Sequence, residues 1–217
     1  EMKYRLVGSE MCIRDSNLDP VAFEFLSFQI RWYSLAYIFG FLIGWFYIKN
    51  FLIKDLREKT LVDDFITYLI LGVIIGGRLG YVIFYNFFYY LSHPFEIFFI
   101  WQGGMSFHGG LLGVCLATYI FTQKYNLNFF RYTDLVSLVA PIGTFLGRVA
   151  NFINSELYGR ETDFIFSVNF NKVDNLFRHP SQLYESFFEG IVLFIILNFL
   201  WKKFSEVPGV ILSLIHI

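Results

Sequence analysis

Residues 135–160, LVSLVAPIGTFLGRVANFINSELYGR, decide the fold of this chain. Residues 135–146 carry no charge, and Arg148 follows within the same apolar run. A run of this length can cross a bilayer as a helix, and an ionisable side chain inside a membrane span indicates a functional site. The alternative is a structural arginine that is tied to a neighbouring carboxylate.

Polar side chains follow Arg148 at helical spacing. Asn151 comes three residues later, and Asn154 or Ser155 six or seven residues later, so that these side chains share one helix face. Glu156 lies at the end of this polar stripe. The sequence therefore predicts a polar site on an otherwise apolar helix.

The composition of the chain is typical of a membrane protein. Its 217 residues are 56% hydrophobic, 22% aromatic and 16% charged, whereas soluble domains contain roughly 25% charged residues. The net charge of −1 argues against a nucleic-acid partner, which would need a basic surface.

Several common kinds of site are missing from the sequence. The two cysteines, Cys12 and Cys115, make neither a disulfide framework nor a metal site, and we interpret Cys115 as a small core residue. The sequence has no Gly-rich phosphate loop, no zinc-ligand spacing and no serine nucleophile elbow.

The predicted fold class is all-α, a polytopic helical membrane protein with five complete transmembrane helices, a truncated sixth and the N-terminus outside. A sixth apolar run begins near Val207, and the short aromatic piece at residues 95–101 is expected to be interfacial or re-entrant. The five complete runs lie at about residues 32–48, 63–87, 105–123, 133–153 and 186–201.

The distribution of lysine and arginine predicts this orientation. These residues gather in the connections after the first, third and fifth runs, whereas the connection at residues 86–104 has none. The long fourth connection also carries three of them, balanced by acidic residues, and weakens this bias a little. Because cytoplasmic loops are enriched in lysine and arginine, the odd connections are predicted to be cytoplasmic. The side chains then expected at the level of the outer leaflet are Tyr33, Arg78, His108, Arg148 and His179.

Such a group of side chains suits an anionic lipid headgroup. Arginine grips phosphate oxygens through two parallel hydrogen bonds, and histidine titrates near neutral pH. Each residue also has a structural interpretation. His108 could be a hydrogen-bonded interfacial histidine, and His179 precedes Pro180 at the start of a helix. The glycines around Arg78 are typical of helix packing, and Tyr33 of an aromatic belt.

Residues 147–159 follow the pattern G-R-x-[GA]-N-F-[hydrophobic]-N-x-E-x-x-G, which resembles the signature of bacterial prolipoprotein diacylglyceryl transferases. The blocks GGRLGYVIFYN (76–86), GGMSFHGGLLG (103–113) and RHPSQLYE (178–185) are also similar to blocks of that family. The resemblance covers roughly residues 17–210.

The resemblance implies an enzyme and its partners. It implies that a diacylglyceryl group passes from phosphatidylglycerol to the lipobox cysteine thiol in the signal peptide of a prolipoprotein, with release of glycerol phosphate. This transfer is the first step of lipoprotein maturation. The resemblance also implies a multi-pass protein of the bacterial inner membrane, with its active site facing the outer side and with no metal or organic cofactor.

Roles for individual residues follow from the same resemblance. It implies that His108 is the base, that Arg148 and Asn151 are the catalytic arginine and asparagine of the signature, and that Tyr33 is a catalytic tyrosine of the first span. We expect Glu156 to hold an arginine in its rotamer. The expected substrate-binding residues are Arg148, Arg78, Glu156, Gly159, Asn154 and His179.

The resemblance also divides the chain into segments. We expect residues 1–16 to be a non-native tail, residues 17–211 to be a C-terminally truncated, membrane-embedded transferase domain, and residues 212–217 to be a second non-native tail. The family continues past the fifth span with two further helices, one of which carries another arginine.

Two other functions fit parts of the pattern. A lipid or anion transporter with an arginine-lined path would be expected to have repeated halves and helices broken at mid-membrane, and the sequence has no internal repeat. A phosphatidyl transferase would be expected to carry a cluster of acidic metal ligands within its spans, and no such cluster is found. The sequence therefore favours diacylglyceryl transfer.

Overall fold

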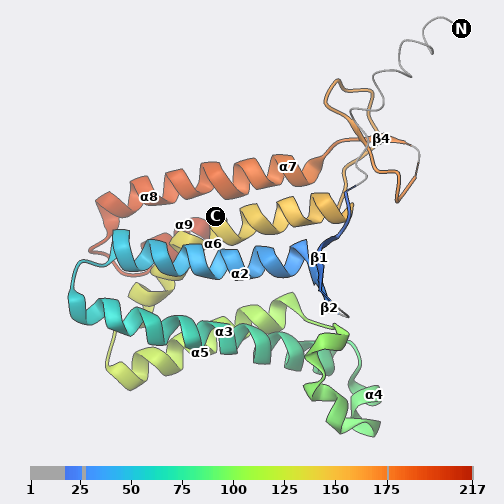
Figure 1. Ribbon diagram of the computed structural model, residues 1–217. Helices are drawn as coiled ribbons and strands as arrows, with labels where there is room; N and C mark the ends of the chain where they lie inside the picture. Colours follow the sequence, from blue (N-terminus) through green and yellow to red (C-terminus); the bar gives the residue numbers. More distant parts are fainter. Residues whose placement is uncertain (1–17, 26–27, 175, 217) are drawn as a thin grey trace, which may run out of the picture. The chain divides into compact units, whose positions relative to one another are not determined.

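A computed structural model describes residues 18–25, 28–174 and 176–216, which are mostly helical (Figure 1). The predicted tail at residues 1–16 lies outside the described residues. The chain divides into two compact units. Unit 1 consists of Glu1–Gly44 and Leu138–Phe199, and unit 2 of Trp45–Ser137 and Leu200–Ile217.

The N-terminal part of unit 1 is a β-hairpin that leads into a long apolar helix. Strands β1 (Val21–Phe25) and β2 (Phe28–Arg31) pair antiparallel, with Glu24 opposite Gln29. The amide of Gln29 donates to the Glu24 carboxylate over 2.8 Å. Helix α2 (Trp32–Tyr47) follows the hairpin directly.

The other part of unit 1 carries the signature stretch and the block at residues 178–185. Helix α6 runs over Phe129–Asn154 and belongs to unit 1 from residue 138 onward. The elements that follow it are β3 (Val168–Asn169), β4 (Phe177–Arg178), α7 (Ser181–Glu185), the π-helical turn η5 (Ser186–Val192) and α8 (Leu193–Phe204). Strands β3 and β4 form a second small antiparallel sheet.

Unit 2 is built around two long helices. Helix α3 begins where the Asp55 carboxylate accepts a hydrogen bond from the backbone of Arg57, and α5 begins where Ser106 caps its first turn. Besides residues 129–137 of α6 and 200–204 of α8, the elements of unit 2 are η2 (Ile48–Leu52), α3 (Leu56–Phe84), α4 (Phe87–Ser92), η3 (Pro94–Phe98), η4 (Ile100–Gln102), α5 (Phe107–Tyr125) and α9 (Val210–His216).

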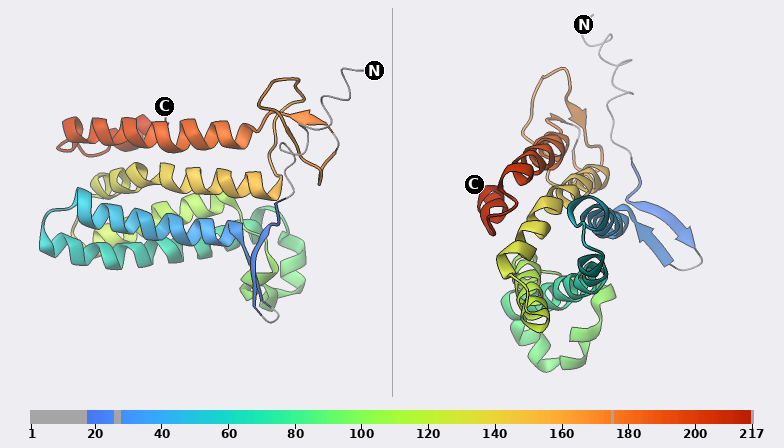
Figure 2. Two further views of the ribbon diagram at one scale, coloured as in Figure 1. Left: turned by 45° about the horizontal axis from the view of Figure 1, so that its top comes forward. Right: turned by 90° about the vertical axis from the view of Figure 1, so that its left-hand side faces the viewer.

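A seam of glycines joins α3 to α5, which lie side by side (Figures 1 and 2). A Cβ atom added to Gly113 would lie 2.0 Å from the carbonyl oxygen of Gly72. A Cβ atom on Gly76 would lie 2.4 Å from the carbonyl oxygen of Gly109. Because any side chain would clash there, glycine is what allows these two backbones to touch.

Unit 2 also has an aromatic core and a buried helix cap. Phe65 and Phe121 are fully buried, with ring centroids 4.9 Å apart. The buried carboxylate of Asp134 accepts the backbone N–H groups of Gly209 and Leu212 over 2.7 and 2.8 Å. It thereby satisfies donors at the start of α9, which have no partner within the helix.

Four helical segments are long and apolar enough to cross a membrane: Trp32–Leu52, Leu56–Phe84, Phe129–Asn154 and Ser181–Phe204. They match the first, second, fourth and fifth predicted runs, and a helical membrane protein is thus confirmed. Helix α5 lies at the third predicted run but is not among the four segments found within the described residues. The third span, the truncated sixth and the outside N-terminus stay predictions.

The structure differs from the all-α prediction in two places. The described residues contain four short strands, because the segment before α2 and the long connection between α6 and α7 each form an antiparallel pair of strands. The interpretation of Cys115 as a core residue is wrong, since this residue is exposed. Ala117, two positions later, is buried on the packed side of α5, and residues two apart on a helix do not share a face.

Candidate functional site

The signature arginine, Arg148, lies on α6 and pairs with two carboxylates. Its Nε atom is 2.9 Å from Oε2 of Glu185, and its Nη2 atom is 3.6 Å from Oε2 of Glu189. The Arg148 side chain is 28% exposed. The guanidinium is therefore held in place and still accessible to a ligand.

A close approach of two helices brings these carboxylates to Arg148. A Cβ atom on Gly190 would lie 2.7 Å from the Cβ atom of Phe145 on α6. The Ser186 hydroxyl donates to the carbonyl oxygen of Phe145 over 3.2 Å. Gly190 and Ser186 both belong to the π-helical turn η5, and single π-turns inside helices are frequent at functional sites.

The loop that ends the signature, residues 155–159, is clamped by the block at residues 178–185. Two motifs that are distant in the sequence are thus in contact, through backbone carbonyl groups that accept hydrogen bonds from side chains and from a backbone N–H group. Three hydrogen bonds join them: Gln182 Nε2 donates to Glu156 O over 2.6 Å, Ser181 Oγ donates to Leu157 O over 2.9 Å, and Gly159 N donates to His179 O over 2.9 Å.

This loop combines backbone strain with unmet hydrogen-bonding capacity. Ser155 and Leu157 have φ angles of 59° and 55°, a region that costs a residue other than glycine about 1–3 kcal/mol. Buried oxygens of Asn154, Ser155 and Gln182 have no hydrogen-bond partner among the described residues. Since buried polar atoms normally have partners, the two features together mark a candidate functional site.

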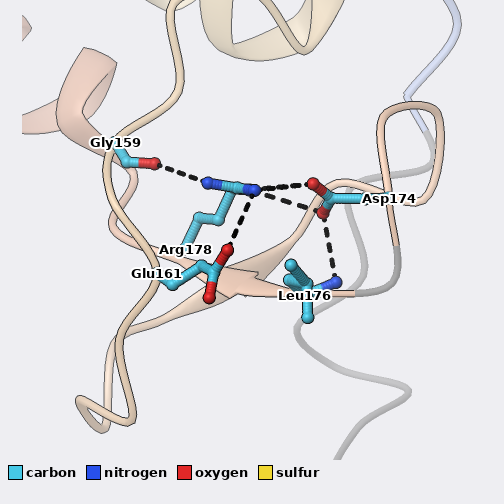
Figure 3. A network of polar contacts seen from close by, with 5 residues as sticks. All are labelled: Gly159, Glu161, Asp174, Leu176 and Arg178. Carbon is cyan, nitrogen blue, oxygen red and sulfur yellow. Dashed lines mark hydrogen bonds and ion pairs between the residues drawn. The ribbon is translucent and has the colours of Figure 1, made fainter.

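Arg178 contacts the end of this loop at Gly159 and binds two carboxylates (Figure 3). Its Nη2 atom is 2.7 Å from the Asp174 carboxylate and 3.5 Å from Glu161, while Nη1 donates to Gly159 O over 3.5 Å. The guanidinium also lies over the ring of Tyr158, 5.0 Å from its centroid. The hydrogen bond from Arg178 holds the pKa of the Asp174 carboxyl below its usual value.

Glycine is required at Gly159 by the same contact. A Cβ atom there would lie 2.7 Å from the carbonyl oxygen and 2.9 Å from the Cβ atom of His179. The Nδ1 atom of His179 is 3.4 Å from the Tyr184 hydroxyl. Gly159 and His179, both predicted substrate-binding residues, are thus in direct backbone contact.

The remaining predicted residues of unit 1 lie on α2 and α6. Asn151 is buried, three residues beyond Arg148 on α6. Tyr33 is half-buried in the first turn of α2, with its ring centroid 5.3 Å from that of Tyr37. Glu156 is exposed. The carboxylates found beside Arg148 are Glu185 and Glu189, whereas the sequence led us to expect Glu156 beside an arginine.

The predicted base, His108, is the second residue of α5 in unit 2. Its side chain is exposed, with the ring centroid 5.6 Å from that of Phe107. Ser106 caps the same turn by accepting a hydrogen bond from the backbone of Gly109 over 3.2 Å. No hydrogen bond joins the His108 ring to another part of the chain that the structure describes. Its nitrogens are therefore open to a substrate.

The second predicted arginine, Arg78, is buried in unit 2. Its side chain on α3 donates to backbone carbonyl groups between Glu96 and Gly104. With 3% of its surface exposed, it differs clearly from the accessible Arg148.

Sequence reasoning missed Glu185 and Glu189 as partners of Arg148. The signal was present, because they are the carboxylates in the apolar run at residues 181–201 and are spaced four apart, so that they share one helix face. The rule that singled out Arg148, an ionisable residue inside an apolar span, applies equally to them.

Known proteins match this chain over most of its length. The family profile described as prolipoprotein diacylglyceryl transferase matches residues 20–216. Proteins named phosphatidylglycerol–prolipoprotein diacylglyceryl transferase are similar: that of Rickettsia canadensis is 53% identical over 186 residues, and that of Rickettsia typhi 51% over 185 residues. Both alignments cover 84% of this chain and 71% of the relative. This chain belongs to the prolipoprotein diacylglyceryl transferase family.

Proposed function

We propose that this protein transfers a diacylglyceryl group from phosphatidylglycerol to the lipobox cysteine thiol of prolipoproteins. Its family and the names of its relatives support this reaction. The observation that carries the proposal is Arg148, an accessible guanidinium held by Glu185 and Glu189 on an apolar helix. An arginine in such a place can bind a lipid phosphate because it keeps its charge in a low-dielectric setting.

The proposed reaction is a displacement at a glyceryl carbon. A thiol has an unperturbed pKa of about 8.5, so a base that accepts its proton raises the fraction of reactive thiolate near neutral pH. We assign this proton to His108. The thiolate sulfur then attacks the glyceryl carbon that carries the phosphate ester. The new C–S bond replaces the C–O bond, and glycerol phosphate leaves with both electrons of the broken bond.

Arg148 is assigned to the charge that gathers on the departing phosphate. Preorganised donors aimed at developing charge are often the largest contribution to catalysis, and the bond from Arg148 to Glu185 fixes its guanidinium in advance. Asn151 and Tyr33 are assigned to orient the headgroup. In addition to Arg148, the proposed substrate-binding residues are Glu156, Gly159, Asn154 and His179. Glu156 and Gly159 lie in the strained loop at residues 155–159, Asn154 directly precedes it, and the backbone of His179 contacts it.

We also propose a place for the protein in the cell. The apolar helices and the family support a membrane enzyme. Lysine and arginine gather in the connections after the first, third and fifth apolar runs, while residues 86–104 have none. This bias supports a bacterial inner-membrane protein with its N-terminus and its active site facing the outer side.

The test is an assay of the protein in liposomes that contain radiolabelled phosphatidylglycerol and a lipobox peptide. We expect label on the peptide, none on a peptide whose cysteine is replaced by serine, and release of glycerol phosphate. Movement of labelled lipid between the leaflets without labelled peptide would instead support the transporter alternative. If phosphatidylglycerol is neither cleaved nor moved between the leaflets, both the transferase and the transporter assignments are wrong.

A further inference from the structure

The guanidinium of Arg78 donates most of its hydrogen bonds to backbone carbonyl groups. Nε donates to Ile97 O over 2.9 Å, and Nη2 donates to Glu96 O over 2.8 Å. Nη1 donates to Gly103 O over 2.5 Å and to Gly104 O over 3.2 Å. Because a guanidinium has five N–H donors, these bonds leave one N–H for any other partner.

The charge of Arg78 is balanced without a carboxylate. No ion pair to it is found among the described residues, and the Glu96 carboxylate instead accepts a hydrogen bond from the Tyr89 hydroxyl over 2.7 Å. The rings of Tyr90 and Tyr81 lie 5.2 and 6.0 Å from the guanidinium carbon, at distances where aromatic faces attract cations. Because Arg78 is 3% exposed, a phosphate that did not displace the surrounding carbonyl groups would find at most the one remaining N–H.

These bonds hold residues 96–104 against α3, and this segment leads directly into α5. Immediately beside Arg78, the carbonyl oxygen of Gly77 accepts the backbone N–H of Ser106 over 2.9 Å. Ser106 is the cap of α5, and His108 follows two residues later. Arg78 and Gly77 therefore fix the start of the helix that carries the proposed base.

Gly104 shows how tightly the segment is fitted. Its φ angle is +83°, and a Cβ atom there would lie 2.4 Å from the ring of Tyr81 on α3. Only glycine adopts such a conformation readily. The segment can reach the carbonyl positions that Arg78 requires because this residue has no side chain.

We propose that Arg78 is a positioning residue, which pins residues 96–104 to α3 and thereby sets the orientation of His108. The sequence led us to expect Arg78 to bind the headgroup phosphate, and this proposal replaces that expectation. The kinetic part of this inference rests on the proposed function, whereas its structural part does not. A lysine cannot replace this arginine, since a single ammonium group lacks the planar fork that serves carbonyl groups on different sides.

The structural part is tested by hydrogen exchange, followed by mass spectrometry, of the whole protein in nanodiscs. In Arg78→Gln we expect the amides of residues 103–109 to exchange at least roughly tenfold faster than in the wild type, because local opening becomes easier. Arg57→Gln is the matched control, an exposed arginine on the same helix α3, and should leave these amides unchanged. Unchanged exchange in Arg78→Gln overturns the proposal without any turnover being measured.

The kinetic part is tested by a double-mutant cycle with His108→Gln. Arg78→Gln should lower kcat by about 10²-fold, which is the loss expected when a catalytic group is displaced by about 1 Å. The KM for phosphatidylglycerol should change little. If Arg78 acts through His108, the double variant should be no worse than His108→Gln alone. Losses that multiply, or a raised KM with kcat kept, would show that Arg78 binds the headgroup itself.

A second variant covers the case in which Arg78→Gln does not fold. Gly104→Ala leaves the arginine and its charge in place but forces the segment away from Tyr81. It should reproduce the faster exchange and the fall in kcat. Normal exchange and turnover in Gly104→Ala would contradict the inference. If the wild-type protein transfers no diacylglyceryl group, the proposed function fails separately, and the exchange measurements still decide the role of Arg78.

Discussion

Replacing Arg148 by lysine keeps the charge but removes the geometry on which the proposed site depends. The guanidinium reaches Glu185 through Nε and Glu189 through Nη2, at 2.9 and 3.6 Å. A lysine has one nitrogen and can keep at most one of these contacts while it binds phosphate. Arg148→Lys should therefore fold and insert, yet lose most of its turnover.

Two magnitudes separate a structural role of Arg148 from a catalytic one. The ion pairs of Arg148 join side chains that are 28%, 35% and 53% exposed, so that losing one of them costs about 0.5–1 kcal/mol. This loss lowers Tm by only about 1–4 °C in a chain of this size. Loss of one preorganised donor to the transition state lowers kcat by about 10²–10³-fold.

The assay combines thermal unfolding in detergent with transfer of labelled diacylglyceryl to a lipobox peptide. Arg160→Lys is the matched control, since Arg160 lies in the same stretch and is exposed. A small change in Tm together with a large fall in kcat, absent from the control, supports the role of Arg148 at the phosphate. Near-normal kcat in Arg148→Lys, or an equal loss in Arg160→Lys, would refute it.

Three further outcomes test other parts of the molecule. His108→Gln should lower turnover at pH 7 by roughly 10²-fold and recover part of the rate at higher pH as the thiol ionises unaided; an equal loss at every pH contradicts the assignment of the base. Gly113→Ala should destabilise the protein by about 1–3 kcal/mol in thermal unfolding, because its Cβ atom would press on the carbonyl of Gly72, and an unchanged Tm argues against the seam. Arg178 lowers the pKa of Asp174, so the stabilisation is present above the unfolded pKa of about 3.9 and is lost as the pH falls through the lower folded value. Asp174→Asn should therefore be more easily cut by protease than the wild type at pH 7, with a difference that shrinks below about pH 4.

The helices were predictable because their driving force is local in the sequence. Apolar runs of spanning length match the helical segments Trp32–Leu52, Leu56–Phe84, Phe129–Asn154 and Ser181–Phe204. The strands were not predictable, because pairs as short as β3 with β4 depend on which polar pieces tertiary packing brings together. The early start of α3 was missed for a related reason, since its first turns are charged and begin at the Asp55 cap.

A candidate site could be proposed from the sequence where one residue is chemically out of place. Arg148 stood out because a charge within an apolar run is costly. Burial could not be predicted in the same way: Arg78 has the same side chain in a similar sequence setting, but backbone carbonyl groups surround it. The sequence identifies a charged residue that needs partners. Only the folded chain shows whether those partners are backbone carbonyl groups, as at Arg78, or carboxylates, as at Arg148.

The π-helical turn η5 has a consequence for how the sequence could change over time. A π-turn holds one more residue per hydrogen-bonded ring than an α-turn, so Ser186–Val192 could lose a residue and remain helical. Such a deletion would turn the wide ring into an α-turn and leave the helix beyond it in place, but it would shift the residues inside the turn, among them Glu189, relative to Arg148. The helix would survive the shortening while the ion pair would not, so that gaps in this turn should be rarer among working descendants than helix stability alone would allow.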